Sequence, residues 1–73
     1  MINLRIYMRW LRDQGGTIRT GIGADHSRVM VPVTRLQSPD GQSYVYPGAD
    51  QFEVLSPLQV EIINRRLGVK YPR

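Results

Sequence analysis

Residues 1–13, MINLRIYMRWLRD, decide the fold, because they mix apolar and basic side chains in a pattern that suits either a strand or a helix. As a helix, the segment would place Arg5, Arg9 and Arg12 on one stripe, at spacings of four and three residues. Its Ile, Tyr and Trp residues favour a strand, whereas its Leu, Met and Arg residues favour a helix. We predict a strand over about residues 3–11, with a helix as the alternative. Arg5 and Arg9 share a face in both cases.

The other end of the chain, residues 55–68 (LSPLQVEIINRRLG), predicts a helix over about residues 56–67. Ser56 precedes a proline and is followed three residues later by Gln59, which is the spacing of a capping box. Gly68 is typical of a position just past a helix end. The apolar residues recur at helical spacing and are expected to face the core: Val60, Ile63 and Leu67, with Leu58 and Ile62 beside them.

Residues 28–47 (RVMVPVTRLQSPDGQSYVYP) predict a β-hairpin around a type I turn at SPDG. Pro32 removes a backbone donor, so its strand is expected at an edge or at a bulge. The alternating valines are expected to face inward, and the tyrosines of the return strand share a face: Val29, Val31, Val33, then Tyr44 and Tyr46. Shorter strands are expected in TIRTGIG (17–23) and FEVLS (52–56).

These elements predict an α+β fold, a small bent antiparallel sheet or partial barrel of four to five strands with one C-terminal helix. The alternative has helices at both ends of a three-stranded sheet. A chain of 73 residues makes a single domain, residues 1–73. The basic segment after Gly68 is expected to be a flexible tail from about residue 69.

The composition narrows the classes of protein. The net charge is +4, and nine of the ten basic residues are arginine, which suits oriented contacts with carboxylates or phosphates. There is no cysteine and one histidine, so disulfides and Cys-based zinc sites are excluded.

No apolar run approaches the roughly 18 residues of a membrane span, and arginines interrupt the N-terminal segment where a signal peptide is apolar. We therefore expect a soluble, cytoplasmic protein.

The sequence offers weak grounds for catalysis. Asp25 and His26 are the one pairing typical of acid-base chemistry, but adjacent residues seldom face each other, and no nucleophile or third ligand completes a site. GGTIRTGIG (15–23) has the glycines of a phosphate loop without its GK[ST] ending. We expect no catalytic residue, no metal and no cofactor, and hence not an enzyme.

Arginine and aromatic side chains gather in the first segment. As a strand, it would set Tyr7 between Arg5 and Arg9, close to Arg12, and such residues dominate protein-protein hot spots. We therefore predict a protein-binding face at these four residues. Two alternatives stay open, namely single-stranded nucleic acid stacking on Tyr7, and Tyr7 packing beneath the helix.

A second basic group closes the chain, at Arg65, Arg66, Lys70 and Arg73. Its helical arginines would also complement the dipole of the C-terminal helix, which explains them without any ligand. This group is the next candidate for a binding surface.

In size, charge and composition, the chain resembles the small host-takeover proteins of bacteriophages. That resemblance implies a non-enzymatic regulator, a monomer that binds a bacterial protein, with RNA polymerase as the target. It further implies inhibition or modulation of transcription, by an initiation block or by antitermination. The alternative function is direct binding of single-stranded DNA or RNA through an Arg/Tyr sheet face.

Overall fold

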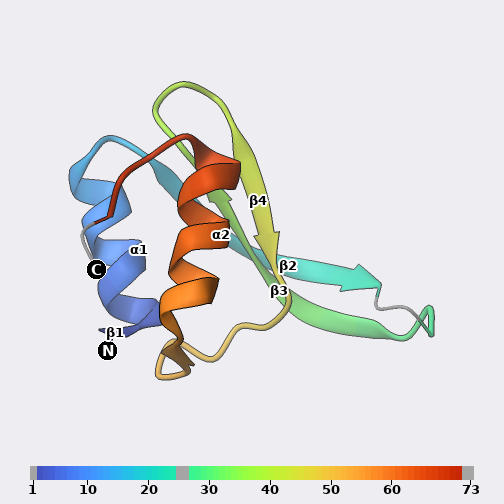
Figure 1. Ribbon diagram of the computed structural model, residues 1–73. Helices are drawn as coiled ribbons and strands as arrows, with labels where there is room; N and C mark the ends of the chain where they lie inside the picture. Colours follow the sequence, from blue (N-terminus) through green and yellow to red (C-terminus); the bar gives the residue numbers. More distant parts are fainter. Residues whose placement is uncertain (1, 25–26, 72–73) are drawn as a thin grey trace.

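A computed structural model describes residues 2–24 and 27–71, and in these residues it shows an α+β fold with two helices and two antiparallel sheets. The elements follow one another as β1 (Ile2–Asn3), α1 (Leu4–Asp13), β2 (Thr17–Ala24), β3 (Met30–Gln37), β4 (Ser43–Tyr46), β5 (Val54–Leu55) and α2 (Pro57–Leu67). One sheet has the order β2-β3-β4, and the other pairs β1 with β5. The two helices lie side by side over one face of the three-stranded sheet (Figure 1), and the described strands form no closed barrel.

The strand predicted for residues 3–11 is wrong, because the chain forms α1 there, and the prediction of a single helix is wrong with it. Asn3 starts the helix, since its Oδ1 accepts a hydrogen bond from the Ile6 N–H at 2.9 Å. A strand would have split the buried side chains between two faces, whereas the helix puts all of them on one. These side chains are Leu4, Tyr7, Met8 and Leu11. The alternative, helices at both ends of a three-stranded sheet, describes the molecule better.

The first turn of α1 is tied to the chain just before β5. The Leu4 N–H donates to the Glu53 carbonyl at 2.9 Å, and the Arg5 N–H donates to the Gln51 carbonyl at 2.8 Å. The first N–H groups of a helix have no partner within it, so these bonds satisfy donors that would otherwise need water. The loop before β5 is thereby held against the start of α1.

The predicted C-terminal helix is confirmed as α2. Ser56 Oγ accepts from the Gln59 N–H at 3.1 Å, and Gln59 Oε1 accepts from the Ser56 N–H at 2.7 Å, which completes the capping box. Gly68 ends the helix in the left-handed region, with φ of 65°. The predicted stripe is buried, at Val60, Ile63 and Leu67. Leu58 and Ile62, expected beside it, are instead 64% and 41% exposed.

The predicted hairpin is confirmed as β3 and β4. The Gly41 N–H donates to the Ser38 carbonyl at 3.0 Å across the turn. The edge strand expected at Pro32 is wrong, because β3 is the central strand of its sheet. At Pro32 itself, however, β3 has run past the end of β4 and pairs with β2 alone, so one side of the strand is unpaired there. Inward alternation of the valines is wrong: Val29 is 55% exposed, and Val33, although buried, lies by alternation on the face opposite to the core residue Leu36. This half of the β2–β3 ribbon projects beyond the helices (Figure 1).

One apolar core joins both helices to the sheet. It is built from α1 and α2 side chains together with Leu36, Tyr46 and Leu55. Val69 and Tyr71 pack against this core, and the Val69 N–H donates to the Asn64 carbonyl at 3.0 Å. The segment after α2 is therefore docked as far as Tyr71, which differs from the flexible tail expected from residue 69.

Candidate functional site

Arg5, Arg9 and Arg12 are exposed on the outer side of α1, and we name them the arginine stripe. Together with Met8 and Gln51 they line an open groove of about 550 Å³. No ion pair joins any of the three arginines to a described residue. Their guanidinium groups are therefore available to carboxylates or phosphates of a partner.

The groove owes its shape to the way α1 is anchored. The hydrogen bond from the Arg5 N–H to the Gln51 carbonyl brings Gln51 to the start of the stripe. Met8 is only 7% exposed and forms an apolar wall of the groove between the arginines. Ile6, which is 47% exposed, lies three residues before Arg9 and adds apolar surface beside it. The site thus combines charged forks with apolar contact area.

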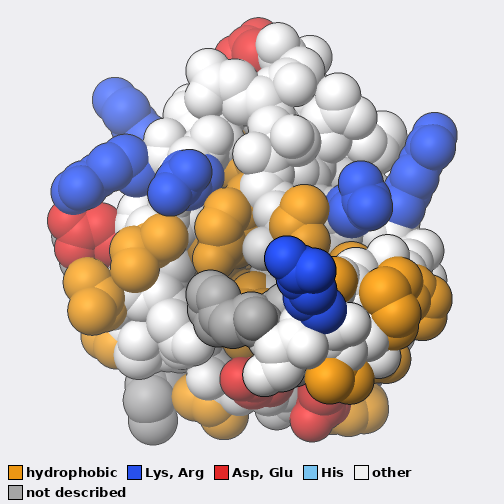
Figure 2. Space-filling view, turned by 90° about the vertical axis from the view of Figure 1, so that its right-hand side faces the viewer, with side chains coloured by type: hydrophobic (Ala, Val, Ile, Leu, Met, Phe, Trp, Pro, Cys, Tyr) orange, Lys and Arg blue, Asp and Glu red, His pale blue; other side chains and the backbone are white. Residues whose placement is uncertain are grey.

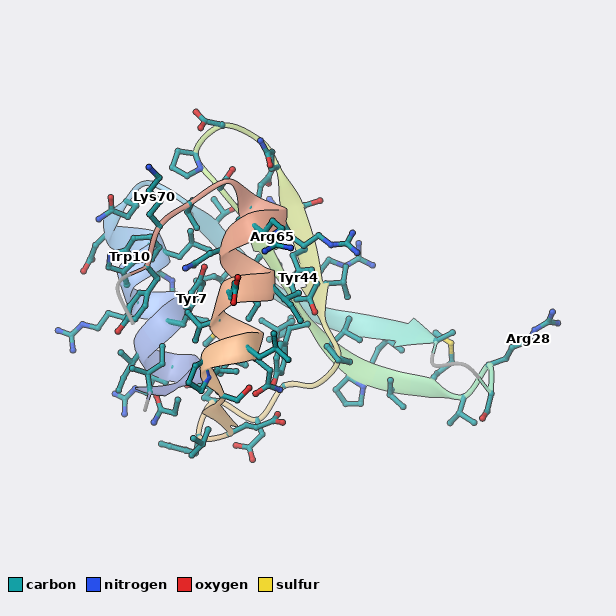
Figure 3. The ribbon with its side chains drawn as sticks, in the orientation of Figure 1. Tyr7, Trp10, Arg28, Tyr44, Arg65 and Lys70 are labelled. Atoms are coloured by element: carbon teal, nitrogen blue, oxygen red, sulfur yellow. The ribbon has the colours of Figure 1, made fainter. Side chains whose placement is uncertain are left out.

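Tyr7 is not part of this surface, so the predicted face of Arg5, Tyr7 and Arg9 is wrong. The side chain is 0% exposed, and its hydroxyl donates to Asn64 Oδ1 at 2.7 Å. Its ring packs against Trp10 and Tyr71, with centroids 5.8 and 5.3 Å away, on the inner side of α1 (Figure 3). Burial raises the pKa of the Tyr7 phenol well above its ordinary value. The helix turns Tyr7 away from the arginines, so the alternative in which Tyr7 packs in the core is confirmed.

The second basic group does not form one patch. Arg65 pairs with Glu61 at 3.1 Å, one helical turn earlier. Lys70 lies on the α1 side of the molecule, near Trp10, whereas Arg65 lies on the β4 side (Figure 3). Arg66 is exposed, and Arg73 lies outside the described residues. The structure thus separates side chains that the sequence places close together.

The outer face of the sheet carries two arginines that sequence reasoning missed as a site. Arg19 of β2 stands directly opposite Arg35 of β3, and both are exposed. Period-two alternation puts each of them on the face away from Ile18 and Leu36, which face the helices. The sequence does not reveal the register of β2 against β3, and only this register makes the two arginines neighbours. Figure 2 views the molecule from the side toward which the β2–β3 ribbon projects, and basic side chains lie on both flanks of this view.

A smaller cavity of about 130 Å³ lies between β4 and α2. Tyr44, Tyr46 and Glu53 line it together with apolar residues of α2. Burial, and secondarily the nearby Glu53 carboxylate, raises the pKa of Tyr46 to about 12. A phenol with so high a pKa stays protonated at neutral pH, so this cavity offers a hydroxyl rather than a base.

Features of other site classes are reported for the described residues only. Within residues 2–24 and 27–71, no group of His, Cys, Asp and Glu side chains could hold a metal ion. The same residues contain no helix with the length and apolar character needed to cross a bilayer. Asp25 and His26, the pairing considered for acid-base chemistry, lie outside the described part of the chain.

No protein-family model matches the chain, and no curated protein or solved structure matches it either. The function is therefore argued from the surfaces themselves. Among these, the arginine stripe combines charge, an apolar wall and a groove.

Proposed function

We propose that the protein is a non-enzymatic regulatory protein that binds an acidic surface of a bacterial protein through the arginine stripe. The observation that carries the proposal is the groove on α1, where three exposed arginines without described ion-pair partners surround Met8. Arginine is enriched at interface hot spots, and apolar area around it supplies the desolvation that makes a charged contact strong. The expected partner is RNA polymerase, because the chain resembles phage regulators in size, charge and composition.

The chemistry around the groove favours a protein partner over a single nucleic-acid strand. Proteins that bind single-stranded nucleic acid stack its bases on exposed aromatic side chains. Here Tyr7 is fully buried, Trp10 is half-buried in the ring cluster with Tyr71, and no aromatic side chain lines the groove. Ile6, which is 47% exposed, instead provides aliphatic surface beside Arg9, which suits contact with another protein.

Binding at this groove would place the protein among regulators that act by occupying a surface of their target. Blocking of initiation and antitermination are the two outcomes we expect for transcription. We also expect it to act as a monomer in the bacterial cytoplasm, without a cofactor.

The first prediction concerns the variant Arg5→Glu/Arg9→Glu. Reversing the charge at these two positions should abolish binding to purified bacterial RNA polymerase, whose acidic groups they are proposed to contact. Loss of a desolvated charge contact costs about 2 to 5 kcal/mol. The thermal midpoint should change little, since exposed substitutions usually stay within about 0.5 kcal/mol. Biolayer interferometry measures the binding and differential scanning fluorimetry measures the midpoint.

The matched control is Arg65→Glu/Arg66→Glu, which changes the net charge by the same amount on α2. Loss of binding in the control and not in the α1 variant would move the site to α2. Wild-type protein that binds no polymerase at low salt, and that recovers no polymerase subunit from a bacterial lysate, would refute the polymerase assignment.

A further inference from the structure

The outer face of the three-stranded sheet presents a second basic surface, separate from the arginine stripe. Its centre is the pair Arg19 and Arg35, which we name the sheet arginine pair. Residues directly opposite in an antiparallel sheet have Cβ atoms about 4.5 to 5.5 Å apart, and like charges in such positions repel. No ion pair joins either arginine to a residue of the described part of the chain. Two cations therefore stand opposite each other without an ion-pair partner among the described residues.

Two glycines on β2 let side chains of β3 lie across the sheet at this point. A Cβ at Gly21 would lie 3.9 Å from Nε of Arg35, and a Cβ at Gly23 would lie 3.1 Å from Cγ1 of Val33. The Arg35 side chain therefore reaches over β2 at Gly21, which lies two residues after Arg19 on the same face. Gly21 has no side chain and so leaves room for Arg35 at this point.

On one side of the pair, the residues are polar and uncharged. The neighbouring row of the sheet consists of exposed side chains with hydroxyl or amide groups, at Thr17, Gln37 and Ser43. Thr17 Oγ1 donates to Gln37 Oε1 at 3.3 Å, which leaves the Gln37 amide NH₂ to donate outward. Val45, which is 47% exposed, is the apolar member of the arginine row. The row on the other side of the pair holds Gly21 and the buried Val33.

We propose that this outer face binds the phosphodiester backbone of a double-stranded nucleic acid. Contacts to phosphate come mainly from Arg, Lys, Ser, Thr and Gln side chains, which is the composition found here. Arginine forks bind phosphate oxygens in pairs, and a phosphate between Arg19 and Arg35 would remove their repulsion. An acidic protein is a poorer fit, because protein hot spots need apolar or aromatic anchors in desolvated pockets.

The position of the aromatic side chains selects a duplex over a single strand. Tyr44 and Tyr46 alternate onto the helix-facing side of β4, where they contact the core. Among the described residues of β2, β3 and β4, the outer face therefore has no aromatic ring on which an unpaired base could stack. The β2–β3 ribbon also projects away from the helices, with Arg28 at its far end (Figure 3), so a long rigid partner can approach without meeting α1 or α2.

The second prediction is a change in the salt dependence of binding. Fluorescence anisotropy with a labelled 20-base-pair DNA duplex should show affinity that falls as salt rises. Arg19→Gln/Arg35→Gln should weaken binding at ~50 mM salt and reduce the slope of log K against log salt by about 2, since each neutralised phosphate contributes about 0.9. Arg19→Lys/Arg35→Lys keeps the charge and should keep most of the slope. RNA of the same sequence, as a duplex, tells which duplex is bound.

Two controls separate this surface from the other basic groups. Arg5→Gln/Arg9→Gln and Arg65→Gln should leave the slope unchanged, so failure of the α1 proposal does not affect this one. The thermal midpoint of the glutamine variant should stay the same or rise, because like-charge repulsion is removed. No binding to either duplex at ~50 mM salt, an unchanged slope in the glutamine variant, or stronger binding to single strands would overturn the proposal. The proposal would also be overturned if the glutamine variant lost binding to a polyglutamate peptide to the same extent as it lost binding to the duplex. That result would indicate an arginine surface for acidic proteins.

Discussion

Tyr7 links the two helices and the C-terminal segment through the side chain of one residue, Asn64. The Tyr7 hydroxyl donates to Asn64 Oδ1 at 2.7 Å, and Asn64 Nδ2 donates to the Tyr71 carbonyl at 3.1 Å. The Asn64 carbonyl accepts in turn from the Val69 N–H. Asn64 has the helical position of a solvent-facing residue, yet these three bonds place it half-buried between α1 and the segment after α2. It therefore fixes the segment after α2 against α1.

The third prediction tests this link with Tyr7→Phe. The ring and its contacts with Trp10 and Tyr71 remain, so the change removes the hydroxyl alone. Loss of one hydrogen bond in a buried setting should lower the free energy of unfolding by about 1 kcal/mol. Urea denaturation measures this difference. Tyr44→Phe is the matched control, because the Tyr44 hydroxyl makes no hydrogen bond with a described residue, and its stability should stay within about 0.5 kcal/mol of wild type.

At the scale of elements, the two helices show what sequence can and cannot predict. α2 carries its own signals, since Ser56, Gln59 and Gly68 specify both ends through local hydrogen bonds and a left-handed residue. α1 carries conflicting propensities, and its cap, Asn3, is a single residue at the very start of the segment. What selects the helix is burial of one whole face against α2 and the sheet, which no local pattern contains.

The same limit applies to the candidate site. The spacing of Arg5, Arg9 and Arg12 predicts a shared helical face, which the structure has, whereas Tyr7 was assigned to that face because the wrong element was chosen. Arg19 and Arg35 are both predicted to lie in strands, but their pairing depends on the register of β2 with β3. The sequence of residues 25–29, between these strands, carries no recognisable hairpin signal, so the register depends on tertiary packing.

The fourth prediction concerns the start of α2. Ser56→Ala should lower the free energy of unfolding by about 1 kcal/mol, because the Gln59 N–H loses its acceptor and the capping box opens. Leu58→Ala is the control within the same turn, since Leu58 is 64% exposed and its truncation should have an effect of no more than about 0.5 kcal/mol. Chemical denaturation followed by circular dichroism measures both. An effect of Leu58→Ala larger than that of Ser56→Ala would mean that this apolar side chain is buried in solution.

At the scale of the whole molecule, the layered fold separates the two arginine surfaces. α1 packs on the inner face of the sheet and turns the arginine stripe outward, while the sheet arginine pair lies on the opposite face of the sheet. A protein bound in the α1 groove would leave the outer sheet face open. The two proposals are therefore compatible, and each is tested by variants that leave the other surface intact.

The fifth prediction follows from two buried phenols in the shared core. Burial raises the pKa of both Tyr7 and Tyr46, and that of Tyr46 goes from 10.0 to about 12. In the unfolded chain both would titrate near the ordinary value, so above that pH the unfolded state binds fewer protons than the folded state, and unfolding is favoured as pH rises. The stabilisation is complete below about pH 10 and should be lost progressively as pH rises toward 12. Thermal melts across this range should therefore show a falling midpoint. Tyr46→Phe removes one of the two groups and should make the fall shallower. A midpoint that stays constant through this range would mean that the phenols reach solvent in the folded protein, contrary to the core described here.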